Sequence, residues 1–223
     1  MTPEPHSPSD EERAAQALIA AAGKILAGEH PDISADFIAA MFARAVPEDL
    51  MRYDARELAA LAADAWTLLA GHKPGTGSVR LASPSTSAAH ERLKAMSVIE
   101  VVNDDMPFLV DSVMGVIADR GFDVQFAVHP IFAVERDPEG HLVAFKGARA
   151  AGPGERRESY IHIHVPRIDD EERRRDVIKA IDAALADIRV SVQDWRAMLD
   201  RVERGFAGGE FIIAQAEEGE VVA

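Results

Sequence analysis

The amino-acid sequence predicts an α+β fold, in which an N-terminal helical subdomain precedes an antiparallel sheet with helices on one face. Two observations predict it. Between residues 10 and 73, apolar residues recur at helical spacing. From residue 97 onward, runs rich in β-branched residues alternate with helical patterns in the order strand, helix, three strands, helix, short strand and last helix. This order is typical of an α+β sandwich.

Composition limits the classes of function. The chain has 223 residues, of which 48% are hydrophobic and 28% charged, as in soluble globular domains. Its net charge of −14 argues against nucleic-acid and anionic-membrane partners, because binding to both requires a basic surface. No apolar run reaches the roughly 18 residues of a membrane span. Cysteine is absent, which excludes disulfides, thiolate metal sites and cysteine nucleophiles, and we expect a cytoplasmic protein.

The helical subdomain is expected over residues 10–73, after a disordered tail over residues 1–9 that is rich in proline and serine. Its first helix has a start and a stop signal. Ser9 and Glu12 have the spacing of a capping box, and Gly28 follows the last alanine of the helical pattern.

Two more helices are expected in this subdomain. Ser34 opens the second and Pro47 closes it, with an apolar face made of Phe37, Ile38, Met41, Phe42 and Ala45. Asp54 and Glu57 form another cap-like pair, which opens the third helix. Pro74 lies beyond its last turn and stops it.

A change of composition follows the helices. Glycine, serine and proline dominate residues 74–96, which we therefore predict to be a linker or irregular connection, with one short strand-like piece at Val79–Ala82. The α+β domain is predicted over residues 97–206. Residues 207–223 are acidic and are expected to be a flexible tail or the start of a next domain.

The first half of the α+β domain is predicted as a strand, a helix and a long extended run. Ser97–Val102 is rich in β-branched residues, and a helix over Pro107–Arg120 follows. Asp123–Val128 alternates between apolar and polar side chains, and the extended run continues to Glu135. Pro130 within this run predicts an edge position or a bulge.

The second half begins with a hairpin turn. In Asp137–Gly140, proline presets φ and glycine accepts a positive φ, so Leu142–Phe145 is expected to return as the hairpin partner. Ser159–Val165 is another alternating strand. A helix, a short strand and a last helix are then expected over residues 169–187, 188–192 and 192–204.

Motifs for chemistry are scarce. The glycine pairs at residues 75–77 and 152–154 do not follow a strand and open a helix, as a dinucleotide fingerprint must. His162 and His164 project from one face of their strand, and with His129 they could hold a metal in a small enzyme. The favoured interpretation places both on an exposed face with Tyr160, while Ile161, Ile163 and Val165 face the core.

The stretch NDDMPFLVD contains the candidate site residues. These are Asn103, Asp104, Asp105, Met106, Pro107, Phe108 and Asp111. Asp104 or Asp105 can cap the following helix, and Pro107 suits its first turn. The helix is apolar enough to be covered on two sides, by its sheet and by either the helical subdomain or a partner subunit.

The string NDDMPFLVDSV, a helix ending in RG, and HPIFAVERDPEGHLV together closely resemble the N-terminal region of the large bacterial NAD-specific glutamate dehydrogenases. The resemblance runs from about Leu58 to Phe206. It implies an ACT-like, ferredoxin-like βαββαβ module. It also implies a downstream catalytic domain of the same polypeptide, a homo-oligomer, and NAD as the cofactor of the parent enzyme. No catalytic, cofactor-binding or metal-binding residue carries over to this chain.

ACT modules often bind an amino-acid effector at the loop between their first strand and helix, with the pattern Asp-x-Pro-Gly-x-Leu. Here Asp105, Pro107 and Phe108 occupy that loop, and Phe108 replaces the glycine. We expect its ring to block or fill a small-ligand pocket. The resemblance thus implies a non-catalytic regulatory or assembly domain of an NAD-dependent glutamate dehydrogenase. The alternative is a free-standing ACT-like module that senses amino acids.

Overall fold

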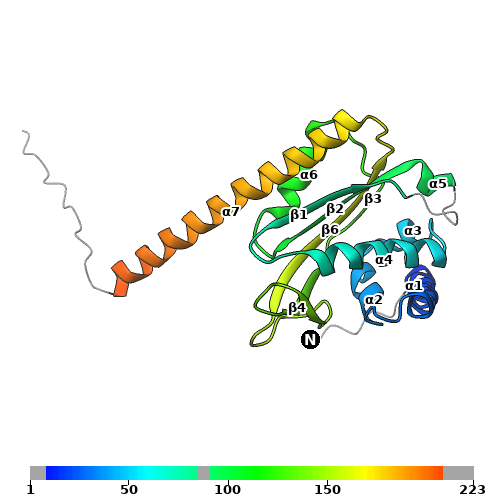
Figure 1. The fold of residues 1–223 in the computed structure, drawn as a ribbon, viewed down its shortest axis with the longest axis horizontal. Coiled ribbons are helices and arrows are strands. Elements are labelled where there is room, and N and C mark those ends of the chain that lie inside the picture. Colours follow the sequence, from blue (N-terminus) through cyan, green and yellow to red (C-terminus); the bar gives the residue numbers. More distant parts are fainter. Residues whose placement is uncertain (1–8, 85–90, 208–223) are drawn as a thin grey trace, which may run out of the picture.

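The structure is a computed structural model that describes residues 9–84 and 91–207. A six-stranded antiparallel sheet lies between two layers of helices, which confirms the α+β class (Figure 1). The predictions for residues 1–8 and 208–223 lie outside the described residues. In the part that is described, no helix is both long and apolar enough to cross a membrane.

The helical subdomain begins with both predicted capping boxes. Its helices are α1 (Asp10–Glu29), α2 (Phe37–Phe42), α3 (Pro47–Leu50) and α4 (Ala55–Gly71). The Ser9 hydroxyl accepts from the Glu12 N–H, and the Glu12 carboxylate accepts from the Ser9 N–H. Asp54 and Glu57 exchange the same pair of bonds at 2.8 Å. Four donors that would otherwise lack partners at the helix starts are therefore satisfied by local sequence.

The sheet has the strand order β1-β2-β6-β4-β5, with β3 also paired to β6. The strands are β1 (Gly77–Ala82), β2 (Met96–Asp104), β3 (Phe126–Val128), β4 (Ile131–Arg136), β5 (Leu142–Phe145) and β6 (Arg156–Pro166). Strands β3 and β4 follow each other along β6 and are separated at His129 and Pro130. Proline lacks the N–H that a continuous strand would need, so the predicted irregularity is a break between two strands.

The predicted hairpin is present between β4 and β5. Asp137 N–H donates to the His141 carbonyl at 3.0 Å, and Gly140 closes the turn with φ 89°. Strand β1 lies inside the stretch 74–96 that was expected to be a linker or irregular connection, and it is two residues longer than the strand-like piece predicted at Val79–Ala82. It forms a full antiparallel ladder with β2, from Gly77 beside Asn103 to Ala82 beside Val98.

The predicted strand over 188–192 is wrong. The helix α7 runs from Glu171 to Ala207 without a break, and its second half extends away from the sheet (Figure 1). Ile188 and Val192 are buried and continue the helical stripe that begins with Val177, Ile181 and Leu185. Their spacing of three and four residues suits one face of a helix, and the edge of the sheet beside β2 is occupied by β1 instead.

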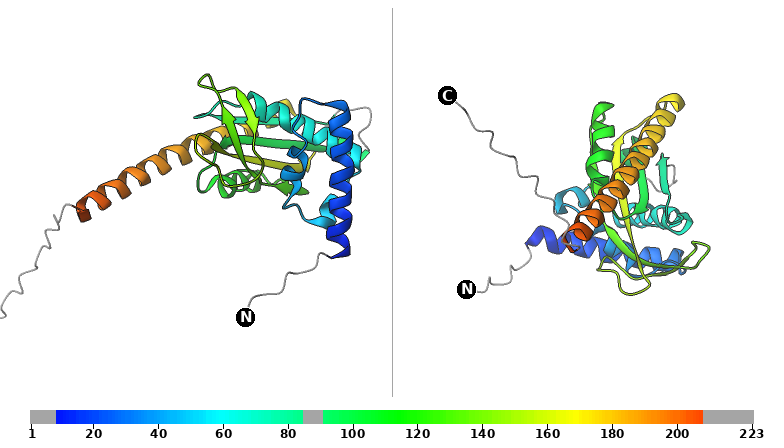
Figure 2. Two further views of the ribbon diagram at one scale, coloured as in Figure 1. Left: turned by 90° about the horizontal axis from the view of Figure 1, so that it is seen from below. Right: turned by 90° about the vertical axis from the view of Figure 1, so that its left-hand side faces the viewer.

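Each face of the sheet has its own hydrophobic core. Helix α6 (Leu109–Asp119) and α7 cover one face, where Ile161, Ile163 and Val165 are buried as predicted. The helical subdomain covers the other face (Figure 2). It therefore does not lie against α6, and the expectation that it could cover the second side of that helix is wrong.

An aromatic cluster joins the helical subdomain to the sheet, and Arg136, which forms a buried ion pair within the sheet, adds a hydrogen bond to the Leu69 carbonyl of α4 at 2.8 Å. The Phe37 ring packs against Trp66, Phe132 and Phe145, with ring centroids 5.1–5.4 Å apart. The Arg136 guanidinium forms two parallel hydrogen bonds with the Glu158 carboxylate, at 2.6 and 2.7 Å.

Candidate functional site

The loop between β2 and α6 is fastened by its acidic side chains. Asp104 accepts from the Gly75 N–H at 2.7 Å and from Arg156 at 3.0 Å. Asp105 pairs with the Arg157 guanidinium at 2.9 Å, and its N–H donates to the Arg157 carbonyl. Helix α6 has no side-chain cap. The interpretation of Asp104 and Asp105 as helix caps is therefore wrong, because both carboxylates pair with segments distant in sequence.

Asn103 ties the same loop to α7. Its side-chain oxygen accepts from Arg189 at 2.6 Å, and its side-chain nitrogen donates to the Asp104 carbonyl at 2.7 Å. Met106 packs against the α6–α7 core. The start of the loop is thus held by polar bonds on both flanks and by one apolar anchor.

Phe108 has an unusual backbone. It is the one residue other than glycine with a positive φ in the described part of the chain, at 69°. Such a conformation costs a residue with a side chain roughly 1–2 kcal/mol. The residue is 67% exposed. Its ring therefore does not fill a pocket, contrary to that part of the expectation. Pro107 and Asp111 are exposed beside it.

The strained conformation has a local consequence. Phe108 aligns with the glycine of the loop pattern that the resemblance implies, and it adopts a left-handed geometry that glycine reaches without cost. Its carbonyl accepts from the Ser112 N–H at 3.0 Å and so starts α6. An exposed aromatic ring held in a costly conformation marks this loop as the candidate interaction site.

The two strand histidines are buried, which corrects the expectation of an exposed face. His162, His164 and Tyr160 are all inaccessible to solvent and face the helical subdomain. Tyr53 bonds to His164 Nδ1 at 2.8 Å, and the Nε2 atoms of His164 and His162 lie 2.8 Å apart. The polar side of this strand therefore lies against a second layer rather than against water.

The chain of bonds continues to a buried carboxylate. Tyr160 lies 3.2 Å from His162 Nδ1 and donates to Glu100 at 2.6 Å, and Arg80 pairs with Glu100 at 2.6 Å. Every one of these bonds is satisfied if each imidazole donates on the side toward Glu100. Burial raises the pKa of Glu100, but the interactions with His162 and Arg80 outweigh it and lower that pKa overall.

The metal-site hypothesis gains no support from this geometry. His129 lies apart from the buried pair and bonds to the Ser159 hydroxyl at 2.5 Å. No group of three or more histidine, aspartate or glutamate side chains among the described residues could hold a metal ion. The signal that sequence reasoning missed is Glu100, a charged residue within the apolar run SVIEVV, which requires a buried partner.

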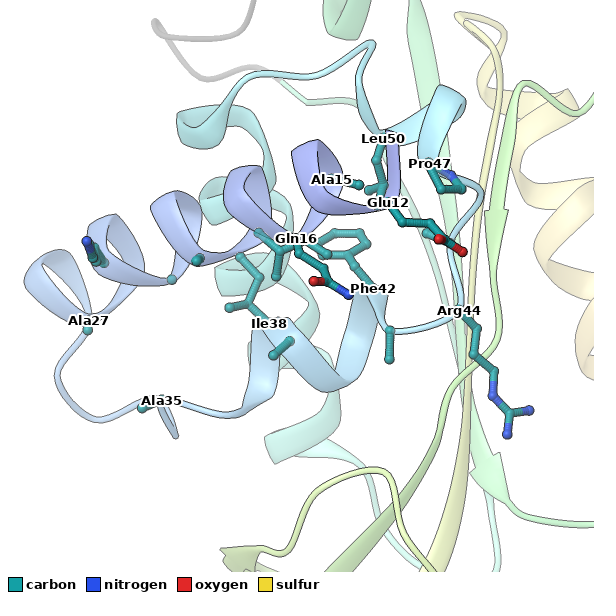
Figure 3. A pocket seen from close by; sticks show the side chains of 17 residues that line it. Glu12, Ala15, Gln16, Ala27, Ala35, Ile38, Phe42, Arg44, Pro47 and Leu50 are labelled. Atoms are coloured by element: carbon teal, nitrogen blue, oxygen red, sulfur yellow. The ribbon is translucent and has the colours of Figure 1, made fainter. Parts of the chain in front are cut away.

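A groove of about 900 Å³ lies between α1, α2 and α3 (Figure 3). Alanines and the apolar side chains of Ile38, Phe42 and Leu50 form most of its lining. Glu12 and Gln16 are polar side chains labelled at its edge, and Arg44 extends away from it in Figure 3. No cluster of titratable groups converges on this groove in the described residues, so it lacks the chemistry of a catalytic site.

His72 gives the fold a predicted sensitivity to acid. It is 1% exposed, bonds to the Ser78 hydroxyl at 2.9 Å, and leaves its Nε2 atom without a hydrogen-bond partner in the described residues. Burial lowers its pKa from the usual 6.5. The folded state therefore favours the neutral ring, and its contribution to stability is lost as pH falls below 6.5 through the lowered pKa.

Replacing His72 with phenylalanine should accordingly reduce the loss of stability on acidification below pH 6.5, because phenylalanine binds no proton. Urea unfolding at a series of pH values measures this slope. His30→Phe is the matched control, because the His30 side chain is exposed. An unchanged slope in His72→Phe would show that another group controls the acid response.

The comparisons with known proteins agree on one family. The family model described as "Glutamate dehydrogenase, ACT1 domain" matches residues 37–181. The chain is 30% identical over 164 residues to the NAD-specific glutamate dehydrogenase of Halomonas elongata, covering 73% of this chain and 10% of that protein. It is 26% identical over 151 residues to the NAD-specific glutamate dehydrogenase of Pseudomonas aeruginosa, covering 68% of this chain and 9% of that protein. The chain thus spans about a tenth of these curated relatives. No solved structure matches it.

Proposed function

The chain belongs to the glutamate dehydrogenase ACT1 domain family, and on this premise we propose that it is a non-catalytic regulatory and assembly domain of an NAD-dependent glutamate dehydrogenase. The parent reaction would convert L-glutamate, NAD and water to 2-oxoglutarate, ammonia and NADH. The names of the two relatives support this reaction and support NAD as the cofactor of the parent enzyme. The downstream catalytic domain would supply the chemistry in the cytoplasm.

The single observation that carries the assembly role is Phe108. Its ring is 67% exposed, and the loop beneath it is fastened by the ion pairs of Asp104 and Asp105. Aromatic side chains on rigid supports are the usual anchors of protein interfaces, because little conformational entropy is lost on docking. We place the contact between copies of this domain at this ring.

The test is sedimentation of the 223-residue chain over a wide range of concentrations. We expect the unaltered chain to self-associate and Phe108→Gly to shift toward monomer. Glycine accepts the positive φ at this position, so loss of association in this variant would not reflect loss of the fold.

Val143→Ala is the matched control, because Val143 is similarly exposed but lies on β5. Its association should equal that of the unaltered chain. A chain that stays monomeric at every concentration would contradict the assembly role and leave the family membership unaffected.

The alternative function, amino-acid sensing, is favoured by one feature of the loop. The backbone at Phe108 keeps the glycine-like conformation, and its ring is turned outward rather than covering the loop. Calorimetric titration with glutamate, aspartate and arginine separates the two functions. Saturable binding at one site per chain that Arg44→Gln leaves unchanged would favour the sensor.

A further inference from the structure

A cavity of about 340 Å³ lies where the helical subdomain meets the sheet. Three segments distant in sequence form it: the end of α2, the break between β3 and β4, and the loop that leads into β6. Arg44, His129, Arg149 and Arg157 are its ionisable lining residues, and no carboxylate lines it. The volume is within the range of small-molecule sites, roughly 300–1,000 Å³.

The arginines retain unused hydrogen-bond donors. Arg44 makes no hydrogen bond or ion pair in residues 9–84 and 91–207, and Figure 3 shows it extending away from the α1–α2 groove. Arg157 uses Nε and one terminal nitrogen on Asp105, which leaves its other terminal nitrogen available. Arg149 pairs with Glu155 at 2.6 Å. The guanidinium groups of Arg44, Arg149 and Arg157 are thus paired with only two carboxylates, those of Asp105 and Glu155.

This surplus of positive charge stands out on an acidic protein. The chain carries a net charge of −14, so nearby carboxylates would ordinarily neutralise an arginine cluster. The charge also acts on His129: burial lowers its pKa, Asp105 opposes that change, and the Arg44 guanidinium adds to it. Arg44 and Asp105 therefore both act electrostatically on the half-buried imidazole.

We propose that this cavity binds a small anion with a carboxylate or phosphate group, held by the free guanidinium of Arg44 and the unpaired edge of Arg157 beside His129. Guanidinium groups form planar, charge-assisted pairs with both kinds of group, so the shared chemistry is an oxyanion. The cavity lies on the face of the sheet that carries the helical subdomain, whereas the β2–α6 loop leads into the helix on the other face.

The proposed site is connected to the loop by one ion pair. Asp105 belongs to the β2–α6 loop and occupies two nitrogens of Arg157. An anion at the free edge of Arg157 leaves those two nitrogens in place but competes with the Asp105 carboxylate for the guanidinium charge, and would so loosen the fastening beneath Phe108. This consequence for assembly rests on the proposed function, whereas binding of the anion does not.

The experiment is calorimetric titration of the full 223-residue chain with two probes, inorganic phosphate and succinate, at constant ionic strength. We expect saturable binding of at least one probe at one site per chain. Arg44→Gln should weaken it roughly tenfold, because one charge-assisted pair is lost. Asp105→Asn should strengthen it several-fold, because the internal competitor for Arg157 loses its charge.

Arg175→Gln is the matched control, since it removes one exposed arginine from α7 on the opposite face of the sheet, and its affinity should be unchanged. Binding of phosphate alone assigns the site to phosphate-bearing ligands, and binding of succinate alone assigns it to carboxylates. The proposal is overturned if neither probe binds when it is present in at least about 20-fold molar excess over the chain and at concentrations up to about 20 mM. These concentrations lie well above the usual dissociation constants of metabolites. It is equally overturned if Arg175→Gln weakens binding as much as Arg44→Gln.

Discussion

Replacing Arg136 with methionine should lower the free energy of unfolding by about 3–5 kcal/mol. Arg136 and Glu158 are 1% and 0% exposed, so the variant would leave the Glu158 carboxylate buried without its partner. The guanidinium also donates to the carbonyls of Leu69 at the end of α4, at 2.8 Å, and of Gly140 in the hairpin turn, at 3.0 Å. Urea unfolding followed by circular dichroism measures the loss.

Two further variants separate a buried charge from a general loss of packing. The double variant Arg136→Met with Glu158→Leu removes both charges and should recover most of the stability. Arg120→Met breaks an ion pair with Asp176, whose side chain is 62% exposed, and should cost less than about 1 kcal/mol. Equal losses in Arg136→Met and Arg120→Met would contradict the explanation from burial.

Phe37→Ala should have an effect of similar size, about 3–5 kcal/mol, for a different reason. The Phe37 ring is fully buried and packs between Trp66 of α4 and the Phe132 and Phe145 rings of the sheet. Truncation removes these ring contacts and leaves a cavity at the junction of the two layers. Urea unfolding at a pH above 7, where His72 stays neutral, measures this loss separately from the acid response.

Phe37→Leu is the matched control, because leucine retains much of the buried volume and should lose less than the alanine variant. Val46→Ala provides a second reference at an exposed position in the same subdomain. If Phe37→Ala proved no more harmful than Val46→Ala, Phe37 would not be a principal contact between the helical layer and the sheet.

Local sequence signals predicted much of the fold. The capping boxes at Ser9 and Asp54 and the turn at Asp137–Gly140 each depend on residues within a few positions of one another. The alternation of side chains along β6 also correctly predicted that Ile161 and Ile163 point to the same face of the sheet, into a hydrophobic core. Such signals are contained in a short window, so one sequence is enough to read them.

The remaining features depend on partners distant along the chain. Alternation showed that His162 faces away from Ile163, but it could not show that a helical layer covers the histidine. Asp104 and Asp105 have the composition of helix caps, and only the fold brings Arg156 and Arg157 beside them. The candidate loop could be identified from its sequence motif, whereas the positive φ of Phe108 is visible only in the structure.

The connection at residues 74–96 divides the chain in composition but not in folding. Glu100 and His162 are buried on the sheet face that the helical subdomain covers. A fragment that began after this connection would expose that face. The two parts that differ in composition therefore fold as one cooperative unit. The family match agrees, since it begins at residue 37 and crosses the connection. Evolution would have to transfer both parts together, because the polar face of the sheet has no other cover within the described chain.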